Sequence, residues 1–469
     1  MKTVDFSGRP FHFIGIGGIG MSALAYVLAK RQIRVSGSDL RSSHITERLE
    51  AVGTHIFSRQ EPTNLEFFQP LDGICTDPLP QVICSTAIAQ NNSEYTAAVE
   101  KGCPVFHRSD VLAALIKDYK SIGVAGTHGK TTTSSLIGYV LLVGGLDPTI
   151  IVGGEVTAWD GNARLGNGDY LVAEADESDG SLTKHWPNIG VVTNIELDHP
   201  DHYESLEDVV KIFQVFESQC DILVGCLDCE RISTQLNPTI TYSLDPAKQA
   251  DYTVKNITYD VNGTTADVWE WGQYLGQMHL TIPGEHNVSN ALAAIAVGRK
   301  LGLEFDVIAQ GLESFEGAKR RFEFRGECNG ITFIDDYAHH PSEIQATLSA
   351  ARSKLGSESS SRVVAIFQPH RYTRTMTFLE DFATSFKAAD LVILTDIYSA
   401  GEANISHLQG QDVAEAVKQH HSQVIYEPDL SSLTQLLPEI LQSGDLVLFL
   451  GAGNLNQIIP QVIASYDPS

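Results

Sequence analysis

The sequence predicts an α/β protein of three domains, and three observations lead to this expectation. At 469 residues, the chain is long enough for about three domains of ~150 residues each. Short apolar segments of strand type alternate with helical segments along much of the chain, which is typical of parallel sheets. Two glycine-containing loops, at residues 15–20 and 126–132, each follow an apolar strand and precede a helix. We therefore expect a Rossmann-like domain over 1–118, a central P-loop ATPase-like α/β domain with a small antiparallel extension over 119–319, and a C-terminal Rossmann-like α/β domain over 320–469.

The composition argues against two classes of partner. The formal net charge of −26 does not suit binding to nucleic acid or to an anionic membrane, which need a basic face. Seven cysteines scattered through a long chain are typical of reduced cytosolic thiols and not of a disulfide framework. The N-terminus lacks the order of a secretory leader, and no apolar run approaches ~18 residues. We expect a soluble cytoplasmic protein with no nucleic-acid or membrane partner, whose oligomeric state the sequence leaves open.

The first glycine-containing loop predicts a diphosphate site at the start of a helix. An apolar strand runs into Gly15, Gly17 and Gly20, which satisfy the pattern G-x-G-x-x-G, and a helical segment follows. After a second strand, Asp39 lies near the distance expected for an acid that binds a ribose. NAD, FAD or another diphosphate would suit this helix N-terminus, and tight helix–strand packing without a ligand would also favour glycine.

Two later strands of the same segment end in polar side chains. The apolar run that begins at Val82 ends in Ser85 and Thr86. The run that begins at Pro104 ends in Arg108, a candidate partner for an anion.

The second loop predicts a nucleoside triphosphate site. It follows an apolar strand and opens a helix, so that backbone N–H groups and the positive end of the helix dipole face an anion. Lys130 can reach the outer phosphates, and the Thr131 hydroxyl can hold Mg²⁺. The match to the strict Walker A pattern is incomplete, because Val124 stands where that pattern has glycine. The loop residues are Gly126, Thr127, His128, Gly129, Lys130, Thr131 and Thr132.

Acidic residues follow the next strands of the central segment. A strand ending at Ala173 runs into four carboxylates between Glu174 and Asp179, and a strand ending at Thr193 is followed by His199. A solvated acidic loop is the plain interpretation of such a run, and Mg²⁺ binding is the chemical one. Parallel strands deliver their carboxyl ends to one edge of a sheet, so we expect a metal–triphosphate site there. It would bring together Lys130, Thr131, Glu174 and His199.

The end of the central segment predicts an antiparallel extension and a further nucleotide contact. Polar and apolar residues alternate over 251–283, with Asn262-Gly263 as a hairpin signal. In the helix that follows, Asn287 and Asn290 share one face. An asparagine in a first turn caps the helix or reads an adenine edge.

The final segment alternates strands and helices, with one helix expected over 377–387, and predicts a second open α/β sheet. Polar groups again follow the strands, at residues 335–341 and 368–374. Arg371 and Arg374 are spaced to form a clamp for a phosphate or a carboxylate.

Taken together, these motifs resemble the Mur ligases, ATP-dependent enzymes that form amide bonds in peptidoglycan precursor synthesis. The resemblance runs from Gly15 to about Gly453 and is closest to the members that join L-alanine to UDP-N-acetylmuramate. The motifs that carry it are Gly15–Ser22, Gly126–Thr133, Glu174–Asp179, Thr193–His199, His286–Asn290, Asp336–Pro341 and Pro369–Arg374.

The resemblance implies a role for each motif. The first loop would hold a UDP diphosphate and not NAD, and the UDP-sugar contacts would be Gly15, Gly17, Gly18, Gly20, Asp39, Ser85, Thr86 and Arg108. The second loop would bind ATP together with His286, Asn287, Asn290 and Asp336. Thr131 and Glu174 would bind Mg²⁺, and His199 would bind or order a second Mg²⁺, so the catalytic set is Lys130, Glu174 and His199. The amino-acid and phosphate clamp would be His339, His370, Arg371 and Arg374.

The implied reaction activates the muramyl carboxylate as an acyl phosphate, which the amine of L-alanine then attacks. Several related ligases support a Mg²⁺ ion with a CO₂-modified lysine, at a spacing that falls near Gln214 here, with Lys211 the nearest lysine. We therefore expect no modified lysine in this chain. The nearer alternative is a muropeptide-recycling ligase of the same superfamily that attaches a tripeptide. A nicotinamide-dependent dehydrogenase would leave the Lys130 loop without a role, and a nucleotide-sensing protein without catalysis would leave the Arg371–Arg374 clamp without one.

Overall fold

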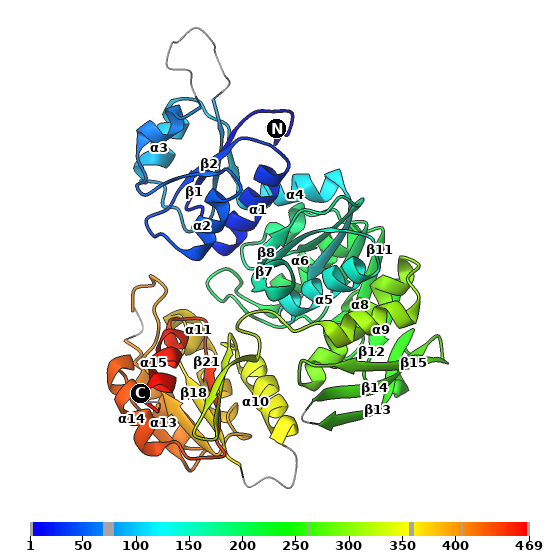
Figure 1. Ribbon diagram of the computed structural model, residues 1–469, viewed down its shortest axis with the longest axis vertical. Helices are drawn as coiled ribbons and strands as arrows, with labels where there is room; N and C mark the ends of the chain where they lie inside the picture. Colours follow the sequence, from blue (N-terminus) through cyan, green and yellow to red (C-terminus); the bar gives the residue numbers. More distant parts are fainter. Residues whose placement is uncertain (1–2, 69–78, 261, 356–360, 405–406, 467–469) are drawn as a thin grey trace.

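The computed structural model describes residues 3–68, 79–260, 262–355, 361–404 and 407–466, and it contains three sheets that follow one another along the chain (Figure 1). Along the longest axis, the N-terminal sheet lies at one end and the C-terminal sheet lies toward the other (Figure 1). Three α/β units with mainly parallel sheets are the fold that the sequence predicts, and this expectation is confirmed. In the described ranges, no helix combines the length and the apolar character that crossing a bilayer requires.

The N-terminal sheet has five parallel strands in the order β3-β2-β1-β4-β5, a Rossmann-like arrangement. The strands are β1 (Phe11–Ile14), β2 (Val35–Ser38), β3 (His55–Phe57), β4 (Gln81–Cys84) and β5 (Val105–His107). The helices are α1 (Ile19–Lys30), α2 (His44–Glu50), α3 (Ser93–Glu100) and α4 (Arg108–Asp118), with a 3₁₀ turn η1 (Pro62–Glu66). Because α1 carries alanine and leucine on its buried side, it packs into the core directly behind the first glycine-containing loop.

The central sheet has ten strands in the order β15-β14-β13-β12-β11-β10-β6-β9-β7-β8. The strands are β6 (Lys120–Ala125), β7 (Thr149–Val156), β8 (Gly161–Arg164), β9 (Tyr170–Glu174), β10 (Ile189–Val192), β11 (Ile222–Cys226), β12 (Ile240–Ser243), β13 (Tyr252–Asp260), β14 (Gly263–Glu270) and β15 (Gln273–Leu280). The expected antiparallel extension is β13–β15, which continues the parallel sheet through β12. Strand β6 lies between β9 and β10, so the loops after these three strands meet at one edge.

The helices of the central unit are α5 (Lys130–Val143), α6 (Leu206–Ser218), α7 (Glu230–Gln235), α8 (Glu285–Lys300) and α9 (Phe305–Ser314), with 3₁₀ turns η2 (Thr157–Trp159), η3 (Ser181–Lys184) and η4 (Pro246–Lys248). Helix α5 packs on α8 and α9 through fully buried side chains such as Leu136, Ile137 and Val140. This packing fixes the start of α5 against the start of α8, and those two ends carry the predicted nucleotide contacts.

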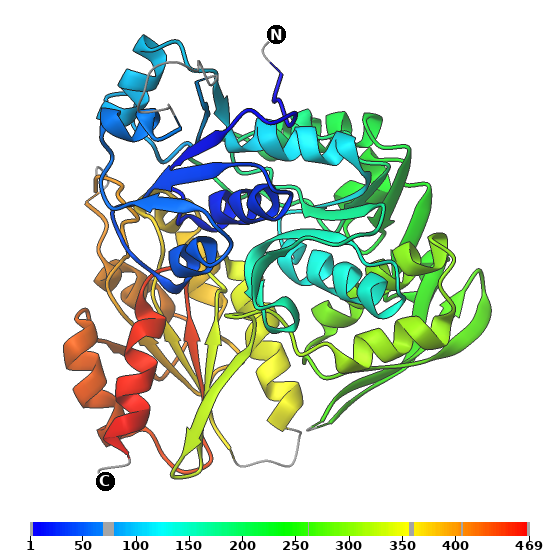
Figure 2. The same ribbon diagram turned by 45° about the horizontal axis from the view of Figure 1, so that its top comes forward.

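The C-terminal sheet has six strands in the order β16-β17-β21-β18-β19-β20, and only the edge strand β16 is antiparallel. The strands are β16 (Glu323–Cys328), β17 (Ile331–Asp336), β18 (Val363–Phe367), β19 (Leu391–Leu394), β20 (Val424–Tyr426) and β21 (Leu446–Leu450). The helices are α10 (Pro341–Leu355), α11 (Tyr372–Thr377), α12 (Leu379–Thr384), α13 (Gly410–Lys418), α14 (Leu430–Ile440) and α15 (Ile459–Ser465), with a 3₁₀ turn η5 (Leu455–Ile458). Two separate apolar clusters show that both faces of this sheet are covered. Helix α10 lies at the junction with the central unit, where it contacts α8 and β13 (Figure 2).

One expected helix is wrong. The segment 377–387 forms no single helix, because α11 ends at Thr377, Phe378 leaves the helical conformation, and α12 spans only Leu379–Thr384. The Phe378 side chain is buried in the apolar cluster, so packing sets this break. We propose domain boundaries at 118/119 and 319/320, where the chain passes from one sheet to the next.

Candidate active site

The phosphate loop has the backbone geometry that the sequence predicts. The loop follows β6, and α5 begins at Lys130 with Gly129 as its N-cap residue in the left-handed region, at φ 79°. A side chain at Gly126 would collide with the Thr193 hydroxyl, and one at Gly129 would lie 2.8 Å from Asn290 Oδ1. Both glycines are therefore required by the close approach of neighbouring strands and helices as well as by their φ angles.

The Lys130 ammonium lies inside this loop. It donates to the carbonyl oxygens of Gly126 at 2.6 Å and Thr127 at 3.0 Å, and to Glu177 Oε1 at 2.9 Å. Burial alone would lower its pKa, but Glu177 and the carboxylates near it raise the pKa well above the usual value. The side chain therefore stays charged, inside the loop that the sequence predicts to bind phosphate.

Thr131 and Glu174 lie together, as expected. The Thr131 hydroxyl donates to Glu174 Oε2 at 2.9 Å, and the Gly153 N–H donates to the same oxygen at 2.6 Å. A hydroxyl and a carboxylate at a phosphate loop are hard oxygen donors of the kind that Mg²⁺ prefers. The donor set therefore fits a Mg²⁺ ion that also binds phosphate.

The acidic run after β9 is neutralised by two cations of the protein. Glu177 pairs with Lys130, while Asp176 and Asp179 lie 3.0 Å and 3.2 Å from the Arg108 guanidinium. Burial opposes ionisation of Asp176, but Lys130 and Arg108 lower its pKa to about 2. The interpretation of this run as a merely solvated loop is therefore wrong.

Arg108 lies between the two glycine-containing loops. It is the first residue of α4 in the N-terminal unit, yet its charge reaches the acidic run of the central unit. A Cβ placed on Gly20 would lie 3.5 Å from Arg108 Nη1, so the guanidinium also borders the start of α1. The position is compatible with the predicted anion contact, although in this structure both ion pairs are made with the protein.

His199 follows the third strand end and lines the same cleft as Lys130, Thr131 and Glu174. Its backbone is left-handed, at φ 55°, and its Nε2 lies 3.5 Å from Asp198 Oδ2. Burial lowers the pKa of His199, which favours the neutral ring that a metal requires. The structure thus brings the four predicted side chains to one cleft of about 660 Å³.

The predicted clamp lies across this cleft, on the C-terminal unit. Arg374 is buried and donates to Asp198 Oδ1 at 2.9 Å, which attaches α11 to the loop after β10. Arg371 is more exposed and donates to Asp201 at 2.9 Å. His370 Nδ1 lies 3.3 Å from Arg374 Nη1, and His339 lines the same cleft.

A second cavity, of about 580 Å³, lies beside the phosphate loop and fits the predicted nucleotide contacts. The predicted residues that line it are His128, Gly129, Thr132, His286, Asn287, Asn290 and Asp336. Capping does not explain the two asparagines: the N-cap residue of α8 is Gly284, and Asn287 Nδ2 donates to the Pro283 carbonyl at 2.7 Å. Asn290 accepts from the Thr133 hydroxyl at 3.0 Å, which joins α8 to α5.

The first glycine-containing loop donates a hydrogen bond to an acidic side chain. The Gly17 N–H donates to Asp39 Oδ2 at 2.8 Å, and Gly18 is the N-cap residue of α1. Gly15 is left-handed, at φ 76°, and Gly20 lies in the first turn of α1. Ser85 and Thr86 follow β4, which pairs with β1, so they lie at the same sheet edge as this loop.

Sequence reasoning missed residues that connect the units. Glu343, in the first turn of α10, lies 3.1 Å from His128 Nδ1 and accepts from the His339 N–H at 3.0 Å. Glu155 on β7 lies 2.8 Å from both His44 Nε2 and Lys319 Nζ, so it joins the N-terminal unit to the end of the central unit. An acidic residue in the first turn of a helix is a recognisable sequence signal, and Glu343 carries it. The signal does not identify the partner His128, which is distant in sequence.

Comparisons with known proteins agree with this geometry. Three family models match: the Mur ligase family catalytic domain at 10–120, the Mur ligase middle domain at 124–298 and the Mur ligase glutamate ligase domain at 320–453. A protein of Crocosphaera subtropica named UDP-N-acetylmuramate–L-alanine ligase is 71% identical, over 99% of this chain and 96% of its own. One of Synechocystis with the same name is 62% identical, over 99% and 98%.

Solved structures give the same result for the fold. The UDP-N-acetylmuramate-alanine ligase of Thermotoga maritima superposes with a TM-score of 0.82 at 29% identity, covering 98% of this chain and 99% of its own. A murein peptide ligase of Psychrobacter arcticus, at 21% identity and a TM-score of 0.70 over 98% and 99%, shares the fold. The chain therefore belongs to the Mur ligase family.

Proposed function

We propose that this chain joins L-alanine to the carboxylate of UDP-N-acetylmuramate, giving UDP-N-acetylmuramoyl-L-alanine, ADP and phosphate. One observation supports this most directly: Lys130, Thr131 and Glu174 share a cleft with the Arg371–Arg374 clamp. A phosphate-activating loop and an anion clamp in one cleft are what an ATP-dependent ligation needs. Relatives that are 59% to 71% identical carry the name of the alanine ligase, which favours alanine over a tripeptide.

The first step makes a carboxylate reactive. A carboxylate oxygen of the muramyl group attacks the γ-phosphorus of ATP, the bond to the β-phosphate oxygen breaks, and an acyl phosphate and ADP result. Lys130 would stabilise the charge that develops on the transferred phosphoryl oxygens. The backbone N–H groups at the start of α5 would hold the β-phosphate.

The second step forms the amide. The neutral amine of alanine attacks the acyl carbon, a tetrahedral intermediate forms, and the bond to the phosphate oxygen breaks as phosphate leaves and the amine loses its proton. Arg371 and Arg374, with His339 and His370 beside them, would orient the alanine carboxylate or the phosphate. Arg374 is already held by Asp198, so it is preorganised, whereas the more exposed Arg371 is free to exchange partners.

The remaining roles are those that the family resemblance implies. Thr131 and Glu174 would bind Mg²⁺, and His199 would bind or order a second Mg²⁺; bound Mg²⁺ would supply positive charge to the phosphates. His286, Asn287, Asn290 and Asp336 would contact the nucleotide. The N-terminal loop, with Asp39, Ser85, Thr86 and Arg108, would hold the UDP-sugar. Since ATP and UDP-sugars are made in the cytoplasm, we place the reaction there.

Phosphate release is the direct test. The purified chain is supplied with ATP, Mg²⁺ and UDP-N-acetylmuramate, and phosphate is measured with alanine, serine, glycine or a tripeptide as the acceptor. Alanine should give the highest kcat/KM, and omission of the UDP-sugar should abolish release. A preference for the tripeptide would instead establish the recycling reaction.

A further inference from the structure

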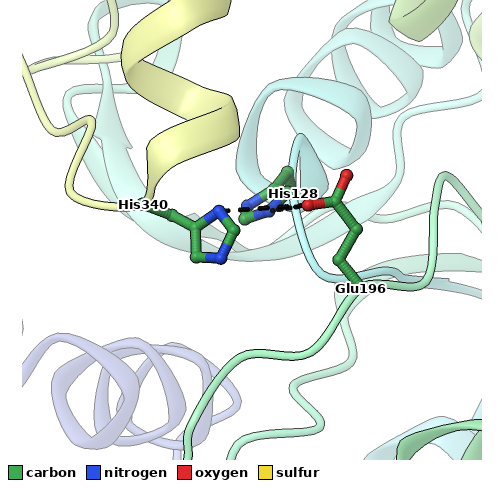
Figure 3. A group of neighbouring side chains, drawn as sticks. All are labelled: His128, Glu196 and His340. Atoms are coloured by element: carbon green, nitrogen blue, oxygen red, sulfur yellow. Dashed lines mark ion pairs between the residues drawn. The ribbon is translucent and has the colours of Figure 1, made fainter. Parts of the chain in front are cut away.

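A cluster of two imidazoles and one carboxylate joins the phosphate loop to the C-terminal unit. His128 stands in the phosphate loop, Glu196 follows β10, and His340 immediately precedes α10 (Figure 3). Each contributes one nitrogen or oxygen to a group of atoms that all lie within 4.8 Å of one another. None of the three belongs to the set proposed for Mg²⁺, which is Thr131, Glu174 and His199.

The distances within the cluster suit a small metal ion. His128 Nε2 lies 3.4 Å from Glu196 Oε2, and His340 Nδ1 lies 3.9 Å from the same oxygen. His340 Nδ1 also accepts from the Ser342 N–H at 3.3 Å, a long hydrogen bond that a metal ion would replace. Tetrahedral ligands at 2.0–2.1 Å from zinc lie about 3.3 Å apart, so modest side-chain shifts would bring the three atoms into range. Two imidazoles and one carboxylate are the ligands of Zn²⁺ and related ions, whereas Mg²⁺ prefers oxygen.

Neighbouring side chains hold the cluster's imidazole and carboxylate groups in place through hydrogen bonds. With Nε2 of His128 facing Glu196, its Nδ1 lies 3.1 Å from Glu343 Oε1, the carboxylate–histidine contact that orients metal-binding imidazoles. Glu196 Oε2 accepts from the Ser342 hydroxyl at 2.6 Å, which holds this oxygen near the ring nitrogens of both histidines. The His340 ring is buried against Phe378, at a ring separation of 4.8 Å.

The cluster also has unused coordination capacity. In the described part of the chain, the buried Nε2 of His128 faces only Glu196, at 3.4 Å, and has no geometrically ideal hydrogen-bond partner. Glu196 and Glu343 raise the pKa of this ring to about 10 despite its burial, so a metal binds Nε2 by displacing a proton. His128 and Glu196 both line the nucleotide cavity, so a fourth ligand, such as water, can enter from that side. A three-ligand site with one open position is a common form of zinc site.

From this geometry we propose that His128, Glu196 and His340 form a binding site for a transition-metal ion of the Zn²⁺ class. His128 and Glu196 belong to the central unit and His340 to the C-terminal unit, so the bound ion ties the two units together beside the phosphate loop. Exchange of nucleotide requires access to that cavity, and an ion held there obstructs it. Zn²⁺ binding therefore inhibits the enzyme and raises its resistance to unfolding.

The test is direct metal binding to the full chain without ATP or UDP-sugar, so that its outcome does not depend on the proposed function. The metal-free protein is titrated with Co²⁺ in excess Mg²⁺, and the visible absorption of low-symmetry Co²⁺ is followed until Zn²⁺ displaces it. Wild type should bind one Co²⁺ in this way. His340→Ala and Glu196→Gln should each weaken binding by at least tenfold, and Glu343→Ala by about ten- to a hundredfold.

Two controls separate this site from others. His199→Ala removes a proposed Mg²⁺ contact and should leave Co²⁺ binding unchanged, and so should His420→Ala on the exposed end of the α13 region. Glu196→Gln keeps an oxygen for the Ser342 hydrogen bond, so it remains informative if His340→Ala folds poorly. The absence of a Co²⁺ band in wild type, or equal weakening in His199→Ala, would show that the cluster is only a network of charged side chains.

Discussion

The two glycine-containing loops share a strand–loop–helix arrangement but differ in the side chains around them. Each follows a buried central strand and opens a helix that packs into the core, so each offers N–H groups to an anion. The central loop adds Lys130 inside the cradle and Glu174 on the next strand, whereas the N-terminal loop adds Asp39, which accepts from the Gly17 N–H. A cation and a metal ligand suit phosphoryl transfer, and a loop without a lysine suits holding a diphosphate. We therefore propose that the flanking side chains, and not the glycines, decide which loop carries the chemistry.

The largest expected effect comes from removing the cation of the central loop. Lys130→Ala should lower kcat for phosphate release by about 10²–10³-fold, since preorganised charge stabilisation of this kind contributes ~2.7–4 kcal/mol. Lys300→Ala, on the exposed end of α8, is a matched control that should keep full activity. More than a tenth of wild-type activity in Lys130→Ala would remove the functional distinction between the two loops.

Lys130→Ala should also lower the stability of the folded protein. Glu177 is 2% exposed and pairs with Lys130, so Lys130→Ala leaves a buried carboxylate without its cation and costs stability. The double variant Lys130→Ala/Glu177→Gln removes that charge and should regain stability, measured by denaturant unfolding, without regaining turnover. Recovery of turnover in the double variant would mean that misfolding, and not chemistry, explains the loss.

Much of this arrangement could be predicted from the sequence, because it depends on the order of strands, loops and helices along short stretches of the chain. A strand, a glycine-containing loop and a helix in this order can form an anion cradle, and helices were expected after both loops, where α1 and α5 lie. Adjacent parallel strands then placed Glu174 and His199 at one edge.

The contacts between units could not be predicted in the same way. The pairing of Arg108 with Asp176 and of Glu343 with His128 joins residues 68 and 215 positions apart. No periodicity or spacing encodes such pairs, because they depend on how whole sheets pack. The single helix expected over 377–387 failed for a related reason, since burial of Phe378 interrupts it.

Burial of His185 beside the contact between Arg108 and the acidic run predicts that stability depends on pH. His185 is buried next to this contact, and among the described residues neither of its ring nitrogens has a hydrogen-bond partner. Burial, with Arg108 nearby, lowers its pKa to about 4 from 6.5. Between pH 6.5 and about 4, His185 is therefore protonated in the unfolded chain but neutral in the folded chain. The free energy of unfolding falls as the pH drops through this range.

At ~1.4 kcal/mol per pKa unit, this single group accounts for about 3 kcal/mol of acid sensitivity. His185→Leu should therefore lose less stability between pH 7 and pH 4 than wild type does, in urea unfolding followed by circular dichroism. His420→Gln, at an exposed position, should behave as wild type. An unchanged pH dependence in His185→Leu would show that the ring is protonated in the folded protein.

A smaller effect should come from the N-terminal loop. Gly17→Val places a Cβ 2.8 Å from Asp39 Oδ2, which displaces the acid and crowds the predicted diphosphate site. The apparent KM for the UDP-sugar should rise by about tenfold or more, ~1.4 kcal/mol, while ATP binding measured by calorimetry stays unchanged.

Gly18→Ala tests the same loop as Gly17→Val without displacing Asp39. Its Cβ would meet only ordinary contacts, at 3.5 Å from the Gly15 carbonyl oxygen, so the free protein should keep its stability. A raised KM for the UDP-sugar in this variant would then report close approach of the ligand itself. Equal weakening of ATP and UDP-sugar in either variant would contradict separate sites.

The smallest expected effect concerns a lysine on α6 that lies outside both loops. Related ligases place a CO₂-modified lysine near the position of Gln214, but a glutamine amide has no amine to modify, and here it donates to the Gln235 carbonyl at 3.2 Å. Lys211 is three residues away, so it leaves the helix on a face rotated by about 60°. Its side chain is 69% exposed and pairs with Asp208 at 2.9 Å, beside a groove formed with α7. Lys211→Ala should therefore stay within about twofold of wild type, ~0.4 kcal/mol, and depletion of bicarbonate should leave phosphate release unchanged. If Lys211→Ala were inactive and short-chain carboxylic acids restored it, a modified lysine would support the metal after all, and the chemistry would reach beyond the two loops.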